Sequence, residues 1–291
     1  MKTITVGALN IVMPTPHSPQ RYVELFQKAF RRKEPVRLRG DFVGMLGGCR
    51  VEQRHDQETV TGEFYKFFDL NLDGQWFNTL EQRPAEEVDL AEIRIPDHLK
   101  PHFQNFSYIF YPRKHRLFFI SKDQTDNLSP LQVQKLLSDI FDDYRLVREF
   151  GEIEITIEPC SESLERILSM PRLKSLRIEI SPPNPDDHEE AERKLFAKMN
   201  SQNAQKIVTD ISTRNPNGLA PDEETKTLAR IAQSNGKVVG HGENEEGQTI
   251  DISTAEHHLL EKTEYNPAVQ ARNDAFFAKA HDLFLKVTRR G

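Results

Sequence analysis

The sequence has little cysteine and no long apolar segment. Its 291 residues include two cysteines, Cys49 and Cys160, which are too few for a disulfide framework or a cysteine-rich zinc site. Residues 117–120 (LFFI) are typical of its longest apolar runs, whereas a membrane helix needs about 20 such residues. Polar residues after Lys2 interrupt anything that resembles a signal-peptide core. These absences favour a cytoplasmic protein without direct membrane insertion.

The sequence also lacks the signatures of familiar enzymes and cofactor-binding proteins. Residues 44–48 (GMLGG) have neither the GxGxxG order nor the following Lys-Ser/Thr of a phosphate-binding loop. There is no GxSxG motif, and the ten histidines show no HExxH or HxH spacing. We therefore expect no cofactor, name no metal ligand and no catalytic residue, and lean toward a protein that is not an enzyme.

Net positive charge is lacking as well, and the two halves of the chain differ in charge. The 39 Lys and Arg residues face 45 Asp and Glu residues, which gives a formal charge of -6. Residues 1–150 contain 21 residues of each sign, so residues 151–291 contain the remaining 18 basic and 24 acidic residues. This difference predicts a boundary near Gly151, with an N-terminal lobe at 1–150 and an acidic C-terminal lobe at 151–291.

Against this background, one short segment is strongly basic. Ser18-Pro19 predicts a helix start, Pro35 ends that helix, and residues 36–39 alternate as a strand with both arginines on one face. Concentrated positive charge suits a phosphate-rich partner, because each neutralised phosphate releases a counterion. The alternative is a solvated surface, since cations also favour helix C-termini. The candidate phosphate contacts in this segment are Lys28, Arg31, Arg32, Lys33, Arg37 and Arg39.

A second basic cluster lies at the tip of a predicted hairpin formed by residues 106–111 and 116–121. Aromatic residues flank this tip, and aromatic rings beside cations can stack on bases, as in single-strand binders. The alternative, which we favour, is that these rings form the core face of the hairpin. The cations of this cluster are Arg113, Lys114 and Arg116.

The remaining patterns predict an α+β fold, with mixed sheets, packed helices and two intimately associated α/β lobes. Gly44, Gly47 and Gly48 are expected to mark a bulge or bend. Trp76 and Phe77 are expected to anchor an irregular stretch to the core. An apolar stripe after Ser129-Pro130 predicts one helix that reaches Val147, and Asn266-Pro267 is expected to open the last helix. In the second half, Glu154 and Arg177 could pair across one sheet.

Two other functions stay open at this point. Asp186, Asp187 and Glu189 could serve a metal-dependent nuclease, although acidic residues at a helix start usually complement the helix dipole. The acidic second half could instead bind a protein partner, as an antitoxin-like regulator does.

Several segments resemble known proteins. Residues 62–78 (GEFYKFFDLNLDGQWFN), 93–101 and 106–121 resemble an uncharacterised bacterial and prophage family that occurs among phage-defence genes and carries only a domain-of-unknown-function label. Residues 173–182 (LKSLRIEISP), 210–218 and 248–266 are similar in layout to the RexA-like proteins of phage exclusion. The two resemblances cover about the first and the second half of the chain.

The resemblance implies a homodimeric DNA-binding protein without enzymatic chemistry, which senses phage replication or recombination intermediates. It also implies a separate effector protein, often membrane-bound. No DNA-contacting residue can be transferred, because no position aligns unambiguously. We therefore expect a nucleic-acid-binding sensor or regulator of a phage-defence system, with DNA favoured as partner. Binding through phosphates should be independent of base sequence.

Overall fold

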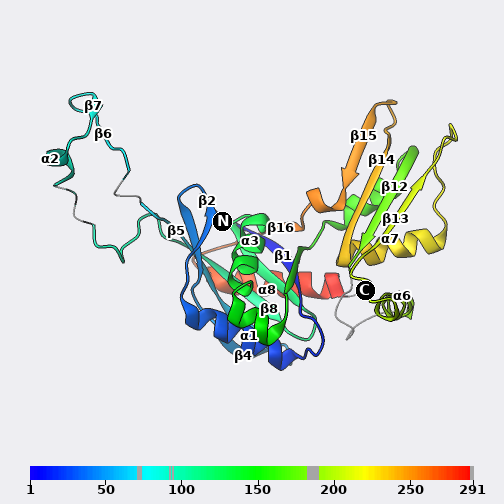
Figure 1. The fold of residues 1–291 in the computed structure, drawn as a ribbon, viewed down its shortest axis with the longest axis horizontal. Coiled ribbons are helices and arrows are strands. Elements are labelled where there is room, and N and C mark those ends of the chain that lie inside the picture. Colours follow the sequence, from blue (N-terminus) through cyan, green and yellow to red (C-terminus); the bar gives the residue numbers. More distant parts are fainter. Residues whose placement is uncertain (71–73, 92, 94, 182–189, 289–291) are drawn as a thin grey trace.

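The computed structural model describes residues 1–70, 74–91, 93, 95–181 and 190–288 (Figure 1). It shows the α+β fold that the sequence predicts, with a larger body, a smaller body beside it, and an arm that extends from the larger body. Within the described ranges, no helix is long and apolar enough to cross a membrane.

The larger body is built on an antiparallel sheet with ten strands among the described residues. The order of its main path is β11-β1-β9-β8-β5-β3-β2, while β16 pairs with β1, β10 with β9, and β4 with β5. The strands are β1 (Lys2–Val12), β2 (Val36–Arg39), β3 (Phe42–Leu46), β4 (Arg50–Arg54), β5 (Gln57–Phe68), β8 (Gln104–Tyr111), β9 (Arg116–Asp123), β10 (Asp126–Asn127), β11 (Glu154–Ile157) and β16 (Leu260–Tyr265), and the helices are α1 (Pro19–Arg32), α3 (Pro130–Phe141), α4 (Tyr144–Phe150) and α8 (Arg272–Thr288).

Helices cover both faces of this sheet. Phe26 of α1 stacks on Phe110 of β8, with ring centres 4.9 Å apart. The next residue of that strand, Tyr111, points to the opposite face, because side chains alternate along a strand. There it stacks on Phe284 of α8 with ring centres 4.1 Å apart. The sheet therefore carries an apolar layer on each face.

The local signals of the first half produce the predicted elements. The Ser18 hydroxyl accepts a hydrogen bond from the Arg21 amide at 3.3 Å and caps α1, and Pro19 is the first helical residue. In β2, Leu38 is buried while Arg37 and Arg39 are exposed, as the alternation predicts. The predicted bend is present at Gly47 and Gly48, since residues 47–49 separate β3 from β4 while both strands pair with β5, whereas Gly44 lies within β3.

Two helix predictions are wrong in their bounds. The helix expected to run through Val147 divides into α3 and α4, because the Asp143 carboxylate accepts a hydrogen bond from the Arg145 amide at 3.0 Å and caps a second helix. The last helix begins at Arg272, not at Asn266. The Asn266 side chain instead accepts a hydrogen bond from the Ala268 amide in a turn that precedes the helix.

The smaller body has a four-stranded antiparallel sheet in the order β13-β12-β14-β15. The predicted pairing of Glu154 with Arg177 is wrong, because β11 pairs with β1 in the larger sheet. Arg177 instead bonds to Glu179 and Asp210 of its own sheet, each at 2.8 Å. The elements are α5 (Ser161–Leu168), β12 (Arg172–Ile180), α6 (Glu190–Ser201), β13 (Ile207–Ser212), α7 (Glu223–Asn235), β14 (Gly236–Glu243), β15 (Thr249–Ser253) and the 3-10 turn η2 (Thr254–Glu256).

The two bodies have separate hydrophobic cores. One core runs from Ile4 to Ile155 and then resumes with Leu259 and the apolar face of α8. The other contains buried residues between Leu164 and Ile252. The end of the chain therefore packs with its beginning. The predicted boundary near Gly151, with lobes at 1–150 and 151–291, stays a prediction.

Glu179 gives the smaller body a defined response to acid. Its carboxylate forms ion pairs with Arg177 at 2.8 Å, with Lys237 at 3.6 Å and with Lys206. Hydrogen bonds from Lys206 and Arg177 lower the pKa of Glu179 from 4.5 to about 2. Because the folded-state pKa is depressed, the stabilisation is complete above about pH 4.5 and is lost as the pH falls toward 2.

We therefore expect Glu179→Gln to flatten the acid dependence of the melting temperature. Between pH 6 and pH 3 the wild-type melting temperature should fall by more degrees than that of the variant, because the variant has no carboxylate to protonate. Glu245→Gln, at an exposed position, is the matched control and should follow the wild type. Parallel curves for wild type and Glu179→Gln would contradict this assignment.

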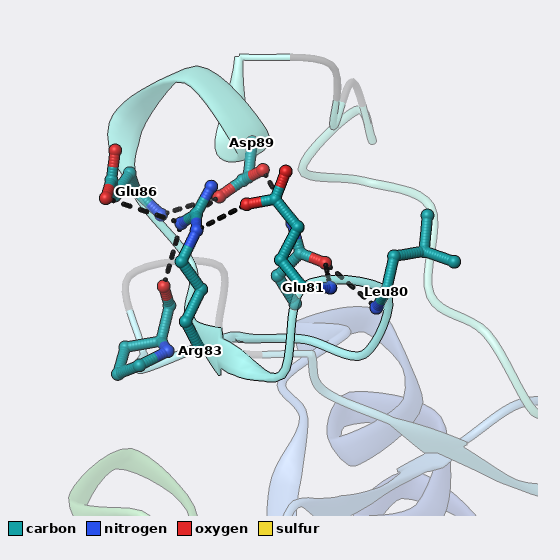
Figure 2. A network of polar contacts seen from close by, with 7 residues as sticks. Leu80, Glu81, Arg83, Glu86 and Asp89 are labelled. Carbon is teal, nitrogen blue, oxygen red and sulfur yellow. Dashed lines mark hydrogen bonds and ion pairs between the residues drawn. The ribbon is translucent and has the colours of Figure 1, made fainter.

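The arm connects β5 to β8, and polar contacts hold its described part together, since no residue of 74–91 is buried. Its elements are β6 (Phe77–Asn78), β7 (Arg83–Pro84) and α2 (Glu87–Leu90). Arg83 lies at the centre and forms ion pairs with Glu81 at 2.5 Å and with Asp89 at 2.9 Å (Figure 2). The expected anchoring of Phe77 to the core is wrong, because 61% of this residue is exposed. The arm therefore presents apolar side chains to solvent, including Leu80 at 93% exposure.

Candidate nucleic-acid interface

The predicted cations of α1 divide into two groups. The apolar face of the helix packs on the sheet, so the basic residues occupy its outer face. Lys28 pairs with Glu149 and lies over the Phe150 ring at 5.5 Å. Arg32 pairs with Glu34 at 2.7 Å and with Asp143. These two cations hold α1 against the region of α4, which leaves them less available for a ligand.

The other cations of the segment are exposed. We call Arg31, Lys33, Arg37 and Arg39 the basic edge, because they follow the end of α1 into β2, the terminal strand of the larger sheet. All four are exposed, and none of them forms an ion pair with another described residue. The buried side chain of Leu38 holds β2 against the core of the larger body. The arginines of β2 are thereby directed to solvent.

The hairpin tip lies apart from the basic edge. His115 stacks on Tyr22 in the first turns of α1, with ring centres 5.0 Å apart, whereas the basic edge follows Arg32. Ten residues of helix separate Tyr22 from Arg32, which is about 15 Å at 1.5 Å per residue. The two predicted clusters therefore do not form one surface patch.

At the hairpin tip, only one of the three predicted cations is exposed. Arg113 is exposed and has no ion pair among the described residues, and Lys114 is half-buried. Arg116 forms an ion pair with the buried Glu158 at 2.6 Å and also donates to the Asn10 side chain. The contribution of these residues to nucleic-acid binding stays a prediction.

The aromatic rings beside the tip belong to the core. Each of Tyr108, Tyr111, Phe118 and Phe119 is at most 1% exposed. Bases cannot reach buried rings, so the stacking alternative is wrong for these four residues and the core alternative is confirmed.

A pocket that the sequence reading missed opens at the far end of the basic edge. It has a volume of about 540 Å³, within the range of small-molecule sites. Lys66 of β5 reaches into this region and is only 6% exposed. A signal was present in the sequence, because Lys66 shares its strand face with Phe64 and Phe68 and so occupies a core-facing position. The lining residues are Arg39, Gly40, Asp41, Phe42, Lys66, Phe68, Gln104, Thr125, Asn127 and Gln132.

A second cavity, of about 340 Å³, lies between the two bodies. Its lining includes Lys206 and Lys237, but both lysines form ion pairs with Glu179, which also lines it. Each of the two lysines therefore already has a carboxylate partner, in contrast to the cations of the basic edge.

A metal site and a reactive thiol are two features through which an enzyme could act. In the part of the chain that the structure describes, no group of three His, Cys, Asp or Glu side chains is placed to hold a metal ion. Asp186, Asp187 and Glu189, the candidate nuclease carboxylates, lie outside the described residues. Burial raises the pKa of the Cys49 thiol to about 11, which keeps it protonated at neutral pH and unsuited to nucleophilic attack.

Comparison with known proteins adds a family but no activity. Among curated proteins no sequence matches the chain, so the resemblance to RexA-like proteins rests on the quoted segments alone. Residues 2–281 match a family described as a domain of unknown function, DUF4747. Because this match spans nearly the whole chain, the protein belongs to the DUF4747 family.

Proposed function

We propose that this protein binds nucleic acid through its basic edge, with DNA as the favoured partner and without regard to base sequence. The observation that carries the proposal is the exposure of Arg37 and Arg39 on a terminal strand, with no carboxylate paired to them among the described residues. Although the chain has a formal charge of -6, cations without a paired carboxylate give this face a positive charge that can attract an anionic partner.

The chemistry of the basic edge suits phosphate groups. An arginine guanidinium presents a planar set of donors that can bind two phosphate oxygens at once. Contacts of this kind position a protein on a nucleic acid but do not distinguish bases. Arg31 and Lys33 extend the same positive surface from the helix. The paired Lys28, Arg32 and Arg116 have a smaller part in this proposal.

The proposed biological role is that of a cytoplasmic sensor or regulator in a phage-defence system, as the resemblance to RexA-like proteins implies. The homodimer and the separate effector protein that this resemblance implies belong to the same proposal.

A salt-titrated binding assay with labelled double- and single-stranded DNA and RNA tests the proposal. Four phosphate contacts on duplex DNA should give a slope of about -3.6 for log affinity against log salt, at about -0.9 per contact. The assay should be run with and without Mg²⁺. Absence of binding at low salt would overturn the proposal and leave an antitoxin-like role, tested by co-purification with a neighbouring gene product. Cleavage that requires Mg²⁺ would favour a nuclease instead.

A further inference from the structure

The pocket beside the basic edge is built from five separate parts of the larger body. The β2–β3 turn, the end of β5, the start of β8, the β9–β10 turn and the first turn of α3 each contribute to its lining. The arm leaves the larger body at the same place, since it begins after β5 and ends before β8 (Figure 1). Strand ends, two turns and the start of a helix therefore meet around the pocket.

A buried cation lies in this pocket. The Lys66 ammonium donates to the Asn127 carbonyl oxygen at 2.7 Å and lies 4.9 Å from the centre of the Phe42 ring. No carboxylate of a described residue forms an ion pair with it. Burial lowers the pKa of Lys66, and Asp126 raises it to a smaller extent. Lys66 also donates to the Asn127 side-chain oxygen at 3.4 Å, so two neutral oxygens of one residue hold the ammonium. A buried charge is stabilised further by a partner of opposite sign, which makes Lys66 a suitable contact for an anionic ligand.

Two further features of the pocket indicate which kind of anionic ligand it would bind. The Gln104 side-chain oxygen is buried and has no hydrogen-bond partner among the described residues, so it is an acceptor that a ligand donor would satisfy. Phe42 and Phe68 line the pocket as an edge-to-face aromatic pair, with ring centres 5.4 Å apart and ring planes at 81°. Arg39 lies at the pocket as a second cation, and Asp41 is the acidic residue of the lining. A nucleotide combines an anionic phosphate with a flat base that carries N–H donors.

We propose that this pocket binds a single nucleotide, with its phosphate at Lys66 and Arg39, its base against Phe42 and Phe68, and a base N–H donated to Gln104. The nucleotide is either free or the phosphorylated end of a strand bound along the basic edge. The pocket shares Arg39 with the basic edge, but the inference stands on Lys66 and Gln104, which the proposed function does not use.

Calorimetric titration with AMP, adenosine and inorganic phosphate tests the pocket. AMP should bind, and adenosine and phosphate should each bind at least roughly tenfold more weakly, because each lacks one of the two recognised parts. Lys66→Met keeps the length of the side chain and removes its charge, and it should lower AMP affinity roughly 10- to 100-fold, the effect of one lost charge-assisted hydrogen bond. The control is Lys122→Met, an exposed lysine of β9 that should leave AMP affinity unchanged.

If Lys66→Met fails to fold, Gln104→Leu serves as the second variant and should weaken AMP but not inorganic phosphate. No AMP binding at millimolar concentration, or equal binding by wild type and both variants, would overturn the pocket assignment. Equal affinity for phosphate and AMP would overturn the base contacts. Arg37→Glu, which lies outside the pocket lining, should retain AMP binding, so failure of the basic edge and failure of the pocket are distinguishable.

Binding of labelled oligonucleotides distinguishes a free nucleotide from the phosphorylated end of a strand. If strands with a 5′ phosphate bind at least roughly tenfold better than strands with a 5′ hydroxyl, and Lys66→Met removes the difference, the pocket takes a strand end. If both strands bind equally while AMP binds, the pocket takes a free nucleotide.

Discussion

The double variant R37E/R39E is expected to lower the affinity for DNA by more than about 100-fold at low salt. Each arginine can donate charge-assisted hydrogen bonds to phosphate, and such bonds contribute about 1.5–3 kcal/mol each. Loss of two therefore corresponds to at least about 3 kcal/mol, or roughly 100-fold, before the repulsion of the new carboxylates is added. The slope of log affinity against log salt should become shallower by about 1.8. Fluorescence anisotropy with labelled duplex DNA measures both quantities.

The matched control for this variant is K122E/K262E. Lys122 and Lys262 are exposed on β9 and β16 of the same sheet, both opposite Thr5, and have no ion pair among the described residues. The change in net charge is the same, so this variant separates the position of the charge from its amount. Both variants should keep the wild-type melting temperature, since exposed substitutions usually alter stability by less than about 0.5 kcal/mol. If R37E/R39E binds as the wild type does, the assignment of DNA binding to the basic edge is wrong.

The elements that local chemistry determines were predictable from the sequence. Ser18-Pro19 and Ser129-Pro130 begin α1 and α3, because serine caps the first turn and proline has no amide hydrogen to leave unpaired. The alternation of residues 36–39 also gave the correct exposure of β2. These features depend on residues within one turn or one strand, so a single sequence contains the necessary information.

The sequence did not predict which cations are free of carboxylate partners and can bind a ligand. Lys28 pairs with Glu149, 121 residues away, and Arg116 pairs with Glu158, which follows β11. Only the fold brings these partners together. The sequence therefore shows nine equivalent candidates, and the structure separates those held by carboxylates from those that face solvent.

Neither the pocket nor the exposure of Phe77 in the arm was predicted, because both depend on contacts that the fold determines. Lys66 and Gln104 are neighbours only because β5 and β8 pair with Lys66 opposite Gln104. Strand register over such a separation depends on the whole core rather than on local pattern. Trp76-Phe77 carries the apolar character of a core segment, but the contacts of Arg83 stabilise that region locally and leave Phe77 exposed. Hydrophobicity alone does not reveal which side chains find a core.

Gly62→Ala is expected to destabilise the larger body by at least about 3 kcal/mol. Gly62 lies on β5 where the link between β3 and β4 crosses it, and an added Cβ would come 2.0 Å from the Gly48 carbonyl oxygen and 2.9 Å from the Tyr108 ring. The closest atom belongs to the backbone, and the Tyr108 hydroxyl donates to the same oxygen at 2.7 Å, so neither neighbour can move without breaking a contact. Overpacking of this kind typically costs about 1–3 kcal/mol, and more when backbone must shift.

Gly44→Ala is the matched control, because it adds the same methyl group to the neighbouring strand. Its nearest atoms would be side-chain carbons of Leu38 and Leu136 at 3.0–3.3 Å, which can adjust by a few tenths of an ångström. Urea unfolding should therefore place Gly44→Ala near the wild type and Gly62→Ala far below it. Hydrogen exchange should localise the loss of protection to residues 42–68 and spare residues 172–253, because the two bodies have separate cores. Equal stability of both variants would show that the Gly48 backbone can move away from an added methyl group at position 62. If the loss is confirmed, the crossing that positions β3 also fixes β2, and with it the two arginines of the basic edge.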